Sequence, residues 1–313
     1  MRDVVLLFPG QGSQVPGMGQ DLCAVYPAAR AVFTAAGETI GEEFFDVLMA
    51  GSAEELTKTI NAQPALLTHG AAVWAVVRDA IGSQVVAAAG HSLGEFTAYH
   101  AADALALPEA VQLVRTRGSL MYEAGQRRPG AMAAILGDMD IPADELCAIS
   151  STDGVVVPAN YNCPGQLVIS GEVGCVERAM LLAKEHGAKR AIRLNVSGAF
   201  HSPLMAEAAA GLAAALELAH FANPRFPVYS NVTSQPIRDA ALARRLLVEQ
   251  LTSPVQWVRE MESLTTLHPE AVYVEMGPGS VLKGLMKKIA PAVNVVACGT
   301  AADVDALMAA VSA

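Results

Sequence analysis

Short apolar runs along this chain alternate with longer segments that carry a helical period. The apolar runs predict buried strands at 4–8, 85–89, 227–230, 271–276 and 293–298. The segments between them predict helices that include 27–36, 53–62, 64–80 and 93–104. A chain that alternates strands with helices in this way favours an α/β fold whose core is a mainly parallel sheet.

The middle of the chain follows a different order. After residue 130 the pattern predicts, in sequence, a strand at 131–136, a helix at 142–149, strands at 155–159 and 166–170, a helix at 172–186 and a strand at 191–196. This β-α-β-β-α-β order is typical of a ferredoxin-like α+β unit. We therefore predict an inserted small domain at 128–198, and a larger core formed by 1–127 and 199–313.

A candidate nucleophile stands between the strand 85–89 and the helix that follows it. The sequence Gly90-His91-Ser92-Leu93-Gly94 matches the nucleophile elbow of a hydrolase-like core, in which a sharp turn exposes the serine hydroxyl. Glycines tolerate the strained backbone of such a turn, and the amide of Leu93 is free to donate to an oxyanion. The alternative is an ordinary surface turn rich in glycine and serine.

An activated serine needs a base, and His201 is the best placed of the seven histidines. It precedes Ser202 and Pro203, which are a good N-cap and a good first residue for the alanine-rich helix that follows. On spacing alone an ordinary loop histidine is the simpler interpretation of His201, because a distant serine and histidine become partners only through the fold. His91 is adjacent to Ser92, so we expect it to pack or to line the pocket.

Composition narrows the class of protein. The 313 residues carry a net charge of −10, which argues against nucleic-acid binding because that would need a basic face. The chain is 52% hydrophobic, yet it has no apolar run of membrane-spanning length. The apolar run at its start is short, so we expect no signal peptide. We expect a cytoplasmic protein that binds no membrane. The five cysteines are scattered, which argues against a disulfide framework and against a zinc site.

Eight motifs in a fixed order give the chain a family resemblance. They are Phe8-Pro9-Gly10-Gln11-Gly12-Ser13-Gln14, Gln63-Pro64-Ala65-Leu66, Gly90-His91-Ser92-Leu93-Gly94-Glu95, Arg115-Thr116-Arg117-Gly118, Asn160-Tyr161-Asn162-Cys163-Pro164-Gly165-Gln166, Gly198-Ala199-Phe200-His201-Ser202, Ser253-Pro254-Val255-Gln256-Trp257 and Glu275-Met276-Gly277-Pro278-Gly279. Nearly from end to end the chain resembles the malonyl-CoA:acyl carrier protein transacylases. It departs from them at Tyr122, where glutamine is more usual, and at Cys163, where serine is usual.

The resemblance implies a transfer in two steps. Ser92 would take the malonyl group from malonyl-CoA as an ester, and the phosphopantetheine thiol of an acyl carrier protein would then remove it. His201 would be the base, the amides of Gln11 and Leu93 would hold the oxyanion, and a backbone carbonyl at Gln250 would orient the histidine. No cofactor of the enzyme itself is implied, since the phosphopantetheine belongs to the partner.

The resemblance also assigns the substrate pocket. Arg117 would bind the free carboxylate of malonate through two parallel hydrogen bonds, and Gln63, Met121, Asn162 and Phe200 would line the pocket. Without the resemblance each of these residues has a simpler explanation. Arg117 would be a surface ion-pair residue, Met121 and Phe200 core residues, Gln63 a helix-start residue and Asn162 a turn former.

An acidic enzyme that binds an acidic carrier protein must gather its cations locally. The candidate clusters are Lys184, Lys189, Arg190, Arg193 and Lys283, Lys287, Lys288, which could instead be solvated faces. We expect a monomer that serves fatty acid or polyketide synthesis. Three alternatives stay open: a serine thioester hydrolase, a malonyl-transferring subunit of malonate decarboxylase, and a non-catalytic carrier-binding module.

Overall fold

A six-stranded sheet forms the centre of the molecule. The computed structural model of the chain describes residues 2–312. The sheet has the order β10-β9-β1-β2-β7-β8, and its pairs are parallel except for β7 with β8. The strands are β1 (Val4–Phe8), β2 (Val85–Gly90), β7 (Val228–Tyr229), β8 (Pro236–Ile237), β9 (Val272–Met276) and β10 (Val295–Cys298). The predicted mainly parallel sheet is therefore confirmed.

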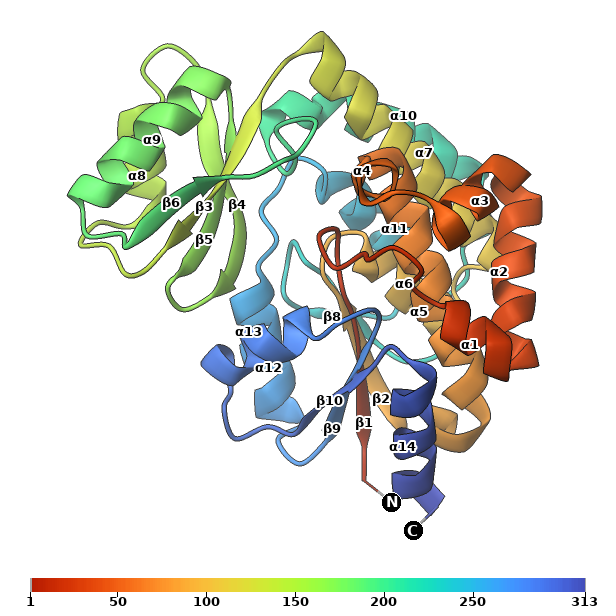
Figure 1. The fold of residues 1–313 in the computed structure, drawn as a ribbon. Coiled ribbons are helices and arrows are strands. Elements are labelled where there is room, and N and C mark those ends of the chain that lie inside the picture. The colour runs from red at the N-terminus through yellow and green to blue at the C-terminus, as the bar shows by residue number, and fades with distance from the viewer. Residues whose placement is uncertain (1, 313) are drawn as a thin grey trace.

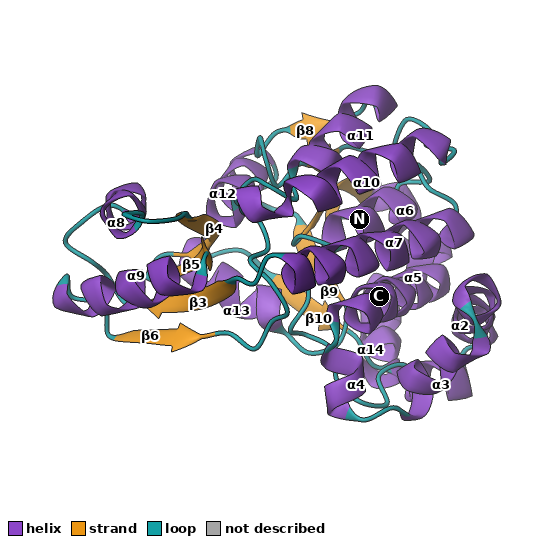
Figure 2. Ribbon diagram, turned by 90° about the horizontal axis from the view of Figure 1, so that it is seen from above, coloured by secondary structure: helices purple, strands orange, loops and turns teal. Residues whose placement is uncertain are grey.

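Helices bury both faces of this sheet, which explains why its strands are continuous apolar runs. Leu6 and Phe8 of β1 face one core, and Val5 and Leu7 face the other. The first core involves α2 (Pro27–Ile40), α5 (Thr59–Ile81), α6 (Gly94–Ala101), α7 (Leu107–Arg127), α10 (Ala206–Leu218), α11 (Ala240–Glu249) and α14 (Ala301–Ser312), and the second involves α12 (Trp257–Leu267) and α13 (Val281–Ile289). Figures 1 and 2 show these layers. The short helices α1 (Gln20–Val25), α3 (Glu42–Ala50) and α4 (Ala53–Thr57) each contact α2 or α5.

The sequence predicts separate helices at 53–62 and 64–80, and this break before Pro64 is wrong, because α5 runs through the proline without interruption. A proline has no N–H, so the carbonyl oxygen of Ile60 loses its partner within the helix. Nη1 of Arg115, on the neighbouring helix α7, donates to that oxygen at 2.8 Å. A side chain distant in sequence thus satisfies the carbonyl that Pro64 leaves free.

A second sheet is built from the middle of the chain and lies to one side of the first (Figure 1). It has the order β4-β5-β3-β6, and all its pairs are antiparallel. The strands are β3 (Ala131–Leu136), β4 (Val156–Cys163), β5 (Gln166–Gly171) and β6 (Arg190–Arg193), covered by α8 (Ala143–Ser150) and α9 (Val173–Glu185). Element order and strand order together confirm the predicted ferredoxin-like unit.

Two contacts fix this small sheet against the large one. Where the chain leaves α7 and later returns, a Cβ atom on Gly125 would lie 2.0 Å from the carbonyl oxygen of Ser197, so only glycine fits there. The edge strand β4 also bonds to the core, because the amide of Tyr161 donates to the carbonyl of Val255 at 2.9 Å. Of the helices that the structure describes in residues 2–312, none has the length and apolar character needed to span a bilayer.

Candidate active site

Ser92 lies in a tight turn between the end of β2 and the start of α6. Its φ angle is +54°, in the left-handed region that non-glycine residues rarely adopt. A Cβ atom on Gly90 would lie 1.9 Å from the carbonyl carbon of Gly94, and one on Gly94 would lie 2.2 Å from the carbonyl oxygen of Phe8. The turn therefore requires both glycines of the motif, and it has the geometry of a nucleophile elbow.

The fold brings His201 to Ser92 across 109 positions of sequence. Oγ of Ser92 lies 2.8 Å from Nε2 of His201, and Nδ1 of the same ring lies 2.8 Å from the backbone oxygen of Gln250. A carbonyl oxygen can only accept, so the proton of the neutral ring is on Nδ1 and Nε2 is the acceptor for the serine hydroxyl. Burial, and then the charge of Arg117, lower the pKa of His201 to about 3. The ring is therefore a neutral base at physiological pH.

The turn before α10 positions the histidine ring. His201 has a φ angle of +57°, and Oγ of Ser202 donates to the carbonyl of Ala199 at 2.6 Å. The same Oγ accepts from the amide of Leu204 at 3.3 Å, as the predicted N-cap requires. Pro203 then begins the single helical turn Pro203–Met205 that leads into α10.

The two backbone amides expected to hold an oxyanion come from two different segments of the chain. The amide of Leu93 follows the nucleophile, and that of Gln11 lies in the loop after β1. Among residues 2–312, neither of these N–H groups donates to another group. The loop passes so close that a Cβ atom on Gly10 would lie 2.6 Å from the carbonyl oxygen of His91. Both residues border the cavity that contains Ser92.

Arg117 is not the surface residue that its sequence context would favour. Its side chain is 1% exposed, and Nη1 donates to Oε1 of Gln63 at 2.7 Å. Nη2 donates to Oε1 of Gln250 at 2.9 Å and to Oγ of Ser92 at 3.1 Å. Burial lowers its pKa to about 10, an effect that the charge of Glu95 opposes, so the guanidinium stays charged at neutral pH.

A small cavity of about 110 Å³ joins these groups. It is lined by Gln11, Gln63, His91, Ser92, Leu93, Arg117, Met121, Met132, Asn160, Leu194, Val196, Phe200 and His201. Gln63, Met121 and Phe200 lie where the sequence placed them, but Asn162 does not line the cavity. Its Oδ1 is instead 2.8 Å from Nε2 of His91, and Asn160 takes the place in the wall.

The small cavity borders a larger one of about 490 Å³, which we call the vestibule. Gln11 and Val196 line both spaces. The vestibule is otherwise lined by Ala53, Glu54, Thr57, Lys58, Thr59, Tyr122, Asn195 and Ser197. Tyr122, one of the two departures from the family pattern, thus lines the vestibule and not the chamber at Ser92.

Comparison with known proteins identifies the family of this chain. Residues 5–310 match the model of the acyl transferase domain family. The chain is 46% identical over 292 residues to a malonyl CoA-acyl carrier protein transacylase of Bacillus subtilis, covering 92% of this chain and 91% of that protein. The chain belongs to the malonyl-CoA:acyl carrier protein transacylase family. This family member is accordingly an acyltransferase.

Further relatives and solved structures extend the similarity. A transacylase of the same description from Escherichia coli is 42% identical over 289 residues, covering 92% of this chain and 93% of that one. The structure of a malonyl-CoA:acyl carrier protein transacylase from Xanthomonas oryzae has a TM-score of 0.94 at 40% identity, covering 99% of both chains. A malonyl-transacylase in complex with a type II polyketide synthase acyl carrier protein has a TM-score of 0.93 at 38% identity, covering 98% of this chain and 99% of that one.

Behind the elbow, this transacylase buries a polar cluster that sequence reasoning missed. Oδ1 of Asn231 accepts from the amide of Ser92 at 2.7 Å, and Nε2 of Gln250 donates to the carbonyl of Ser92 at 3.1 Å. Two fully buried carboxyl groups, Glu95 and Glu260, bond to Asn231 from either side. The one signal in the sequence was Glu95, which directly follows the elbow motif.

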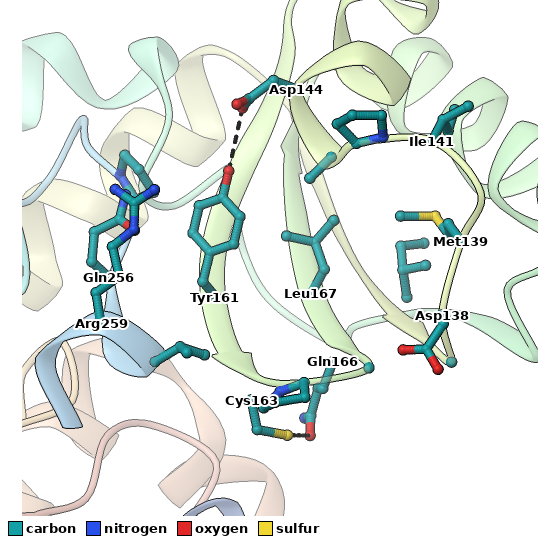
Figure 3. A pocket seen from close by; sticks show the side chains of 18 of the residues that line it. Asp138, Met139, Ile141, Asp144, Tyr161, Cys163, Gln166, Leu167, Gln256 and Arg259 are labelled. Atoms are coloured by element: carbon teal, nitrogen blue, oxygen red, sulfur yellow. Dashed lines mark hydrogen bonds between the residues drawn. The ribbon is translucent and has the colours of Figure 1, made fainter. Parts of the chain in front are cut away.

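A larger cavity of about 710 Å³ lies away from this chemistry, between the small sheet and α12 (Figure 3). Ser92, His201 and Arg117 do not line it. Its wall includes Tyr161, whose hydroxyl lies 3.2 Å from Oδ1 of Asp144, and the charged residues Asp138, Arg259 and Glu262. Carboxylates outnumber cations there, so this cavity is a poor match for an anionic thioester. Within residues 2–312, no cluster of three or more His, Cys, Asp or Glu side chains could hold a metal ion.

Proposed function

We propose that this transacylase moves a malonyl group from malonyl-CoA to Ser92 and then to the phosphopantetheine thiol of an acyl carrier protein. The product would supply fatty acid or polyketide synthesis. One observation carries the proposal: a buried, charged Arg117 shares a cavity of about 110 Å³ with the nucleophile. A guanidinium there suits an acyl group that ends in a carboxylate, and the small volume suits a short one. The names of the relatives support the same substrate pair.

In the proposed mechanism His201 first acts as the base. Nε2 removes the proton of Ser92 while Oγ attacks the thioester carbonyl, and the amides of Leu93 and Gln11 donate to the oxyanion that forms. The tetrahedral intermediate collapses with cleavage of the carbon–sulfur bond, and His201 returns the proton to the departing thiol. The malonyl group remains as an ester of Ser92. The thiol of the carrier protein then attacks this ester through the same steps in reverse.

Arg117 supplies the selectivity in this proposal. Two of its nitrogens donate to oxygens that an incoming carboxylate can replace, one on Gln63 and one on Ser92. The malonyl carboxylate would accept bidentately from the guanidinium and leave the reacting carbonyl over Ser92. Met121 and Phe200 would close the remaining apolar wall, and the vestibule would hold the pantetheine arm.

We also propose where the carrier protein binds and how the chain is divided. Lys184, Lys189, Arg190, Arg193, Lys287 and Lys288 are exposed, which suits an acidic partner. Of these, Arg193 already pairs with Glu177 at 2.9 Å. The catalytic core would comprise residues 1–127 and 199–313, with 128–198 as the small domain, and the enzyme would act as a monomer in the cytoplasm.

Intact-mass measurement tests this proposal directly. Incubation with malonyl-CoA alone should add one malonyl group, and peptide mapping should locate it on Ser92. Ser92→Ala should remove the adduct, whereas Ser83→Ala, at an exposed serine before the same strand, should retain it. Adding a phosphopantetheinylated carrier protein should then discharge the adduct. An adduct on another residue, or release of free malonate faster than transfer, would contradict the proposal, and the second result would indicate a thioester hydrolase.

A further inference from the structure

Glu95 lies behind the nucleophile, on the second residue of α6, and its side chain is fully buried. Oε2 accepts from Nε2 of Gln250 at 2.7 Å and from the amide of Asn231 at 3.2 Å. No direct ion pair joins Glu95 to Arg117 in the part of the chain that the structure describes. Instead the side-chain amide of Gln250 lies between the two charges.

The two charges fix the orientation of that amide. A guanidinium can only donate, so Oε1 of Gln250 must face Arg117, from which it accepts at 2.9 Å. An ionised carboxylate can only accept, so Nε2 must face Glu95. The result is a continuous path of hydrogen bonds from the carboxylate through the amide to the guanidinium. Nε2 also donates to the carbonyl of Ser92, so the amide holds the turn of the nucleophile as well.

This arrangement differs in its consequences from a direct salt bridge. A carboxylate that paired face to face with Arg117 would occupy the donors that a malonyl carboxylate needs. Here the counter-charge stands behind an amide, so it stabilises the buried guanidinium without covering the face that borders the cavity. Nη2 still reaches Ser92, and Nε of Arg117 has no hydrogen-bond partner within residues 2–312.

The ionised state of Glu95 depends on every charged or titratable group that faces it. Arg117 from α7 favours the carboxylate, whereas Glu260 from α12 disfavours a second charge, and Tyr99 from α6 is neutral because burial raises its pKa. Burial and then the charge of Glu95 raise the pKa of Glu260 well above the ordinary range. Burial raises the pKa of Glu95 to about 7, against the opposing hydrogen bonds of Asn231 and Gln250 and the charge of Arg117. The charge of Glu95 disfavours ionisation of Glu260, so Glu95 is the first of the two carboxyl groups to ionise as the pH rises.

We propose that Glu95 is a positioning residue which, through Gln250, sets how strongly Arg117 holds the malonyl carboxylate. The inference rests on the proposed function. The negative charge of Glu95 weakens the attraction between Arg117 and the malonyl carboxylate. Arg117 therefore binds the malonyl group firmly enough to select it but weakly enough to release it to the second thiol. The same charge acts little on an acetyl group, which has no carboxylate. Glu95 thus acts on the preference between the two acyl groups more than on the chemical step.

The test compares kcat/KM for malonyl-CoA and acetyl-CoA at pH 8.5 in the wild type and in Glu95→Gln. Glutamine keeps an acceptor oxygen for Gln250 and Asn231 but removes the charge. The ratio of malonyl to acetyl kcat/KM should rise about tenfold, mainly through a lower KM for malonyl-CoA, as expected for one charge removed at an effective dielectric constant of about 20. Glu260→Gln is the matched control, because it changes an equally buried carboxyl group that does not bond to Gln250, and it should leave the ratio unchanged.

The double variant Glu95→Gln/Glu260→Gln excludes the possibility that a charge on Glu260 replaces the one removed from Glu95. Without Glu95 as a like-charged neighbour, Glu260 could ionise in its place and conceal the effect, and the double variant removes both carboxyl groups. If the ratio in the double variant equals that of the wild type, the proposal is wrong. It is equally wrong if Glu95→Gln lowers kcat/KM for both substrates by the same factor, because that result indicates that Glu95 only supports the fold.

A pH series on the wild type decides the matter even if the variants fold poorly. As the pH falls from 8.5 to 6, protonation of Glu95 should raise the ratio of malonyl to acetyl kcat/KM. The protonation of His201 and of the CoA moiety affects both substrates and cancels in the ratio. A ratio that does not change with pH would overturn the proposal. Failure of the proposed function is a separate result, because the wild type would then not load malonyl on Ser92 at all.

Discussion

Oγ of Ser92 accepts a hydrogen bond from Nη2 of Arg117 at 3.1 Å, and its own proton points to Nε2 of His201 at 2.8 Å. In the free enzyme the positive charge therefore engages the oxygen that must attack. A malonyl carboxylate that binds the guanidinium competes for this donor and frees a lone pair of the nucleophile. The substrate with a carboxylate thus removes a restraint that an acetyl group leaves in place.

Arg117→Ala should exchange the preferred substrate instead of abolishing activity. Loss of a partly desolvated, charge-assisted pair costs about 2–5 kcal/mol. Only malonyl-CoA bears this cost, because an acetyl group has no carboxylate to pair with Arg117. Acetyl-CoA should gain relative to malonyl-CoA in kcat/KM. Arg115→Ala is the control on the same helix, since Arg115 bonds to Ile60 and Asn61 and should affect both substrates alike. An equal fall for both substrates in Arg117→Ala would show that Arg117 supports only the fold or the dyad.

Phe200→Ser should widen the acyl pocket without inverting its preference. Phe200 lines the cavity one residue before the base, and exclusion of one methyl group is worth about 1–3 kcal/mol. The ratio of methylmalonyl to malonyl loading on Ser92 should therefore rise about tenfold. Phe200→Leu keeps most of the bulk and serves as the control. An unchanged ratio in Phe200→Ser would mean that the ring belongs to the core alone.

As the pH is lowered, the rate of loading on Ser92 should begin to decline only far below the usual pKa of a histidine. The pKa of His201 is lowered to about 3, so the base stays neutral as the pH falls through 6.5. Single-turnover loading from acetyl-CoA should therefore show no decline between about pH 8 and pH 5. Because the charge of Arg117 contributes to that lowering, Arg117→Ala should move the decline to higher pH. A decline near pH 6.5 in the wild type would contradict the assignment.

Gln250→Met tests the role of the Gln250 side chain without changing the role of its backbone carbonyl. The carbonyl that orients His201 remains, but Arg117 and Glu95 both lose a buried partner, at about 1–3 kcal/mol for each. The free energy of unfolding should fall, and malonyl loading should fall more than acetyl loading. Gln256→Met, at a half-buried glutamine near the larger cavity, should change neither. Equal losses for the two substrates would refute a specific effect on Arg117.

Gly94→Ala should disrupt the elbow, because the added Cβ atom would lie 2.2 Å from the backbone oxygen of Phe8, which cannot move aside. Overpacking of this kind costs about 1–3 kcal/mol or more. Thermal denaturation should show a lower Tm, with loss of loading on Ser92. Gly284→Ala should keep both the Tm and the loading, because its new Cβ atom would have no atom within 4 Å apart from its chain neighbours and the adjacent backbone of its own helix.

The sequence predicted the elements that local chemistry determines. The strand 4–8 and the elbow followed from short apolar runs and from two glycines that the turn requires. The small sheet followed from the order of its elements. The break at Pro64 was wrong because the partner that rescues the helix, Arg115, is remote in sequence.

The residues of the site that were misplaced or missed depend on the tertiary fold. The register of β4 shifts between Pro158 and Asn160 and again between Tyr161 and Cys163, so simple alternation does not show which asparagine faces the cavity. Glu95, Asn231 and Glu260 come from three separate segments and are buried together only when the chain has folded. Charged residues are seldom fully buried, so apart from the position of Glu95 directly after the elbow motif, the local sequence did not indicate this cluster.

The close approach at Gly125 allows the segment 128–198 to be exchanged between related transacylases. The chain leaves the large sheet and returns to it at one crossing, where Gly125 touches the backbone of Ser197 with no side chain between them. A segment whose two ends meet can be replaced without stretching the rest of the chain. Met132, Asn160, Leu194 and Val196 lie between these ends and form part of the cavity wall. Ser92, His201 and Arg117 line the same cavity but lie outside this segment. Transplanting residues 128–198 as one cassette would therefore change the walls around the acyl group and leave the reacting atoms on their original scaffold.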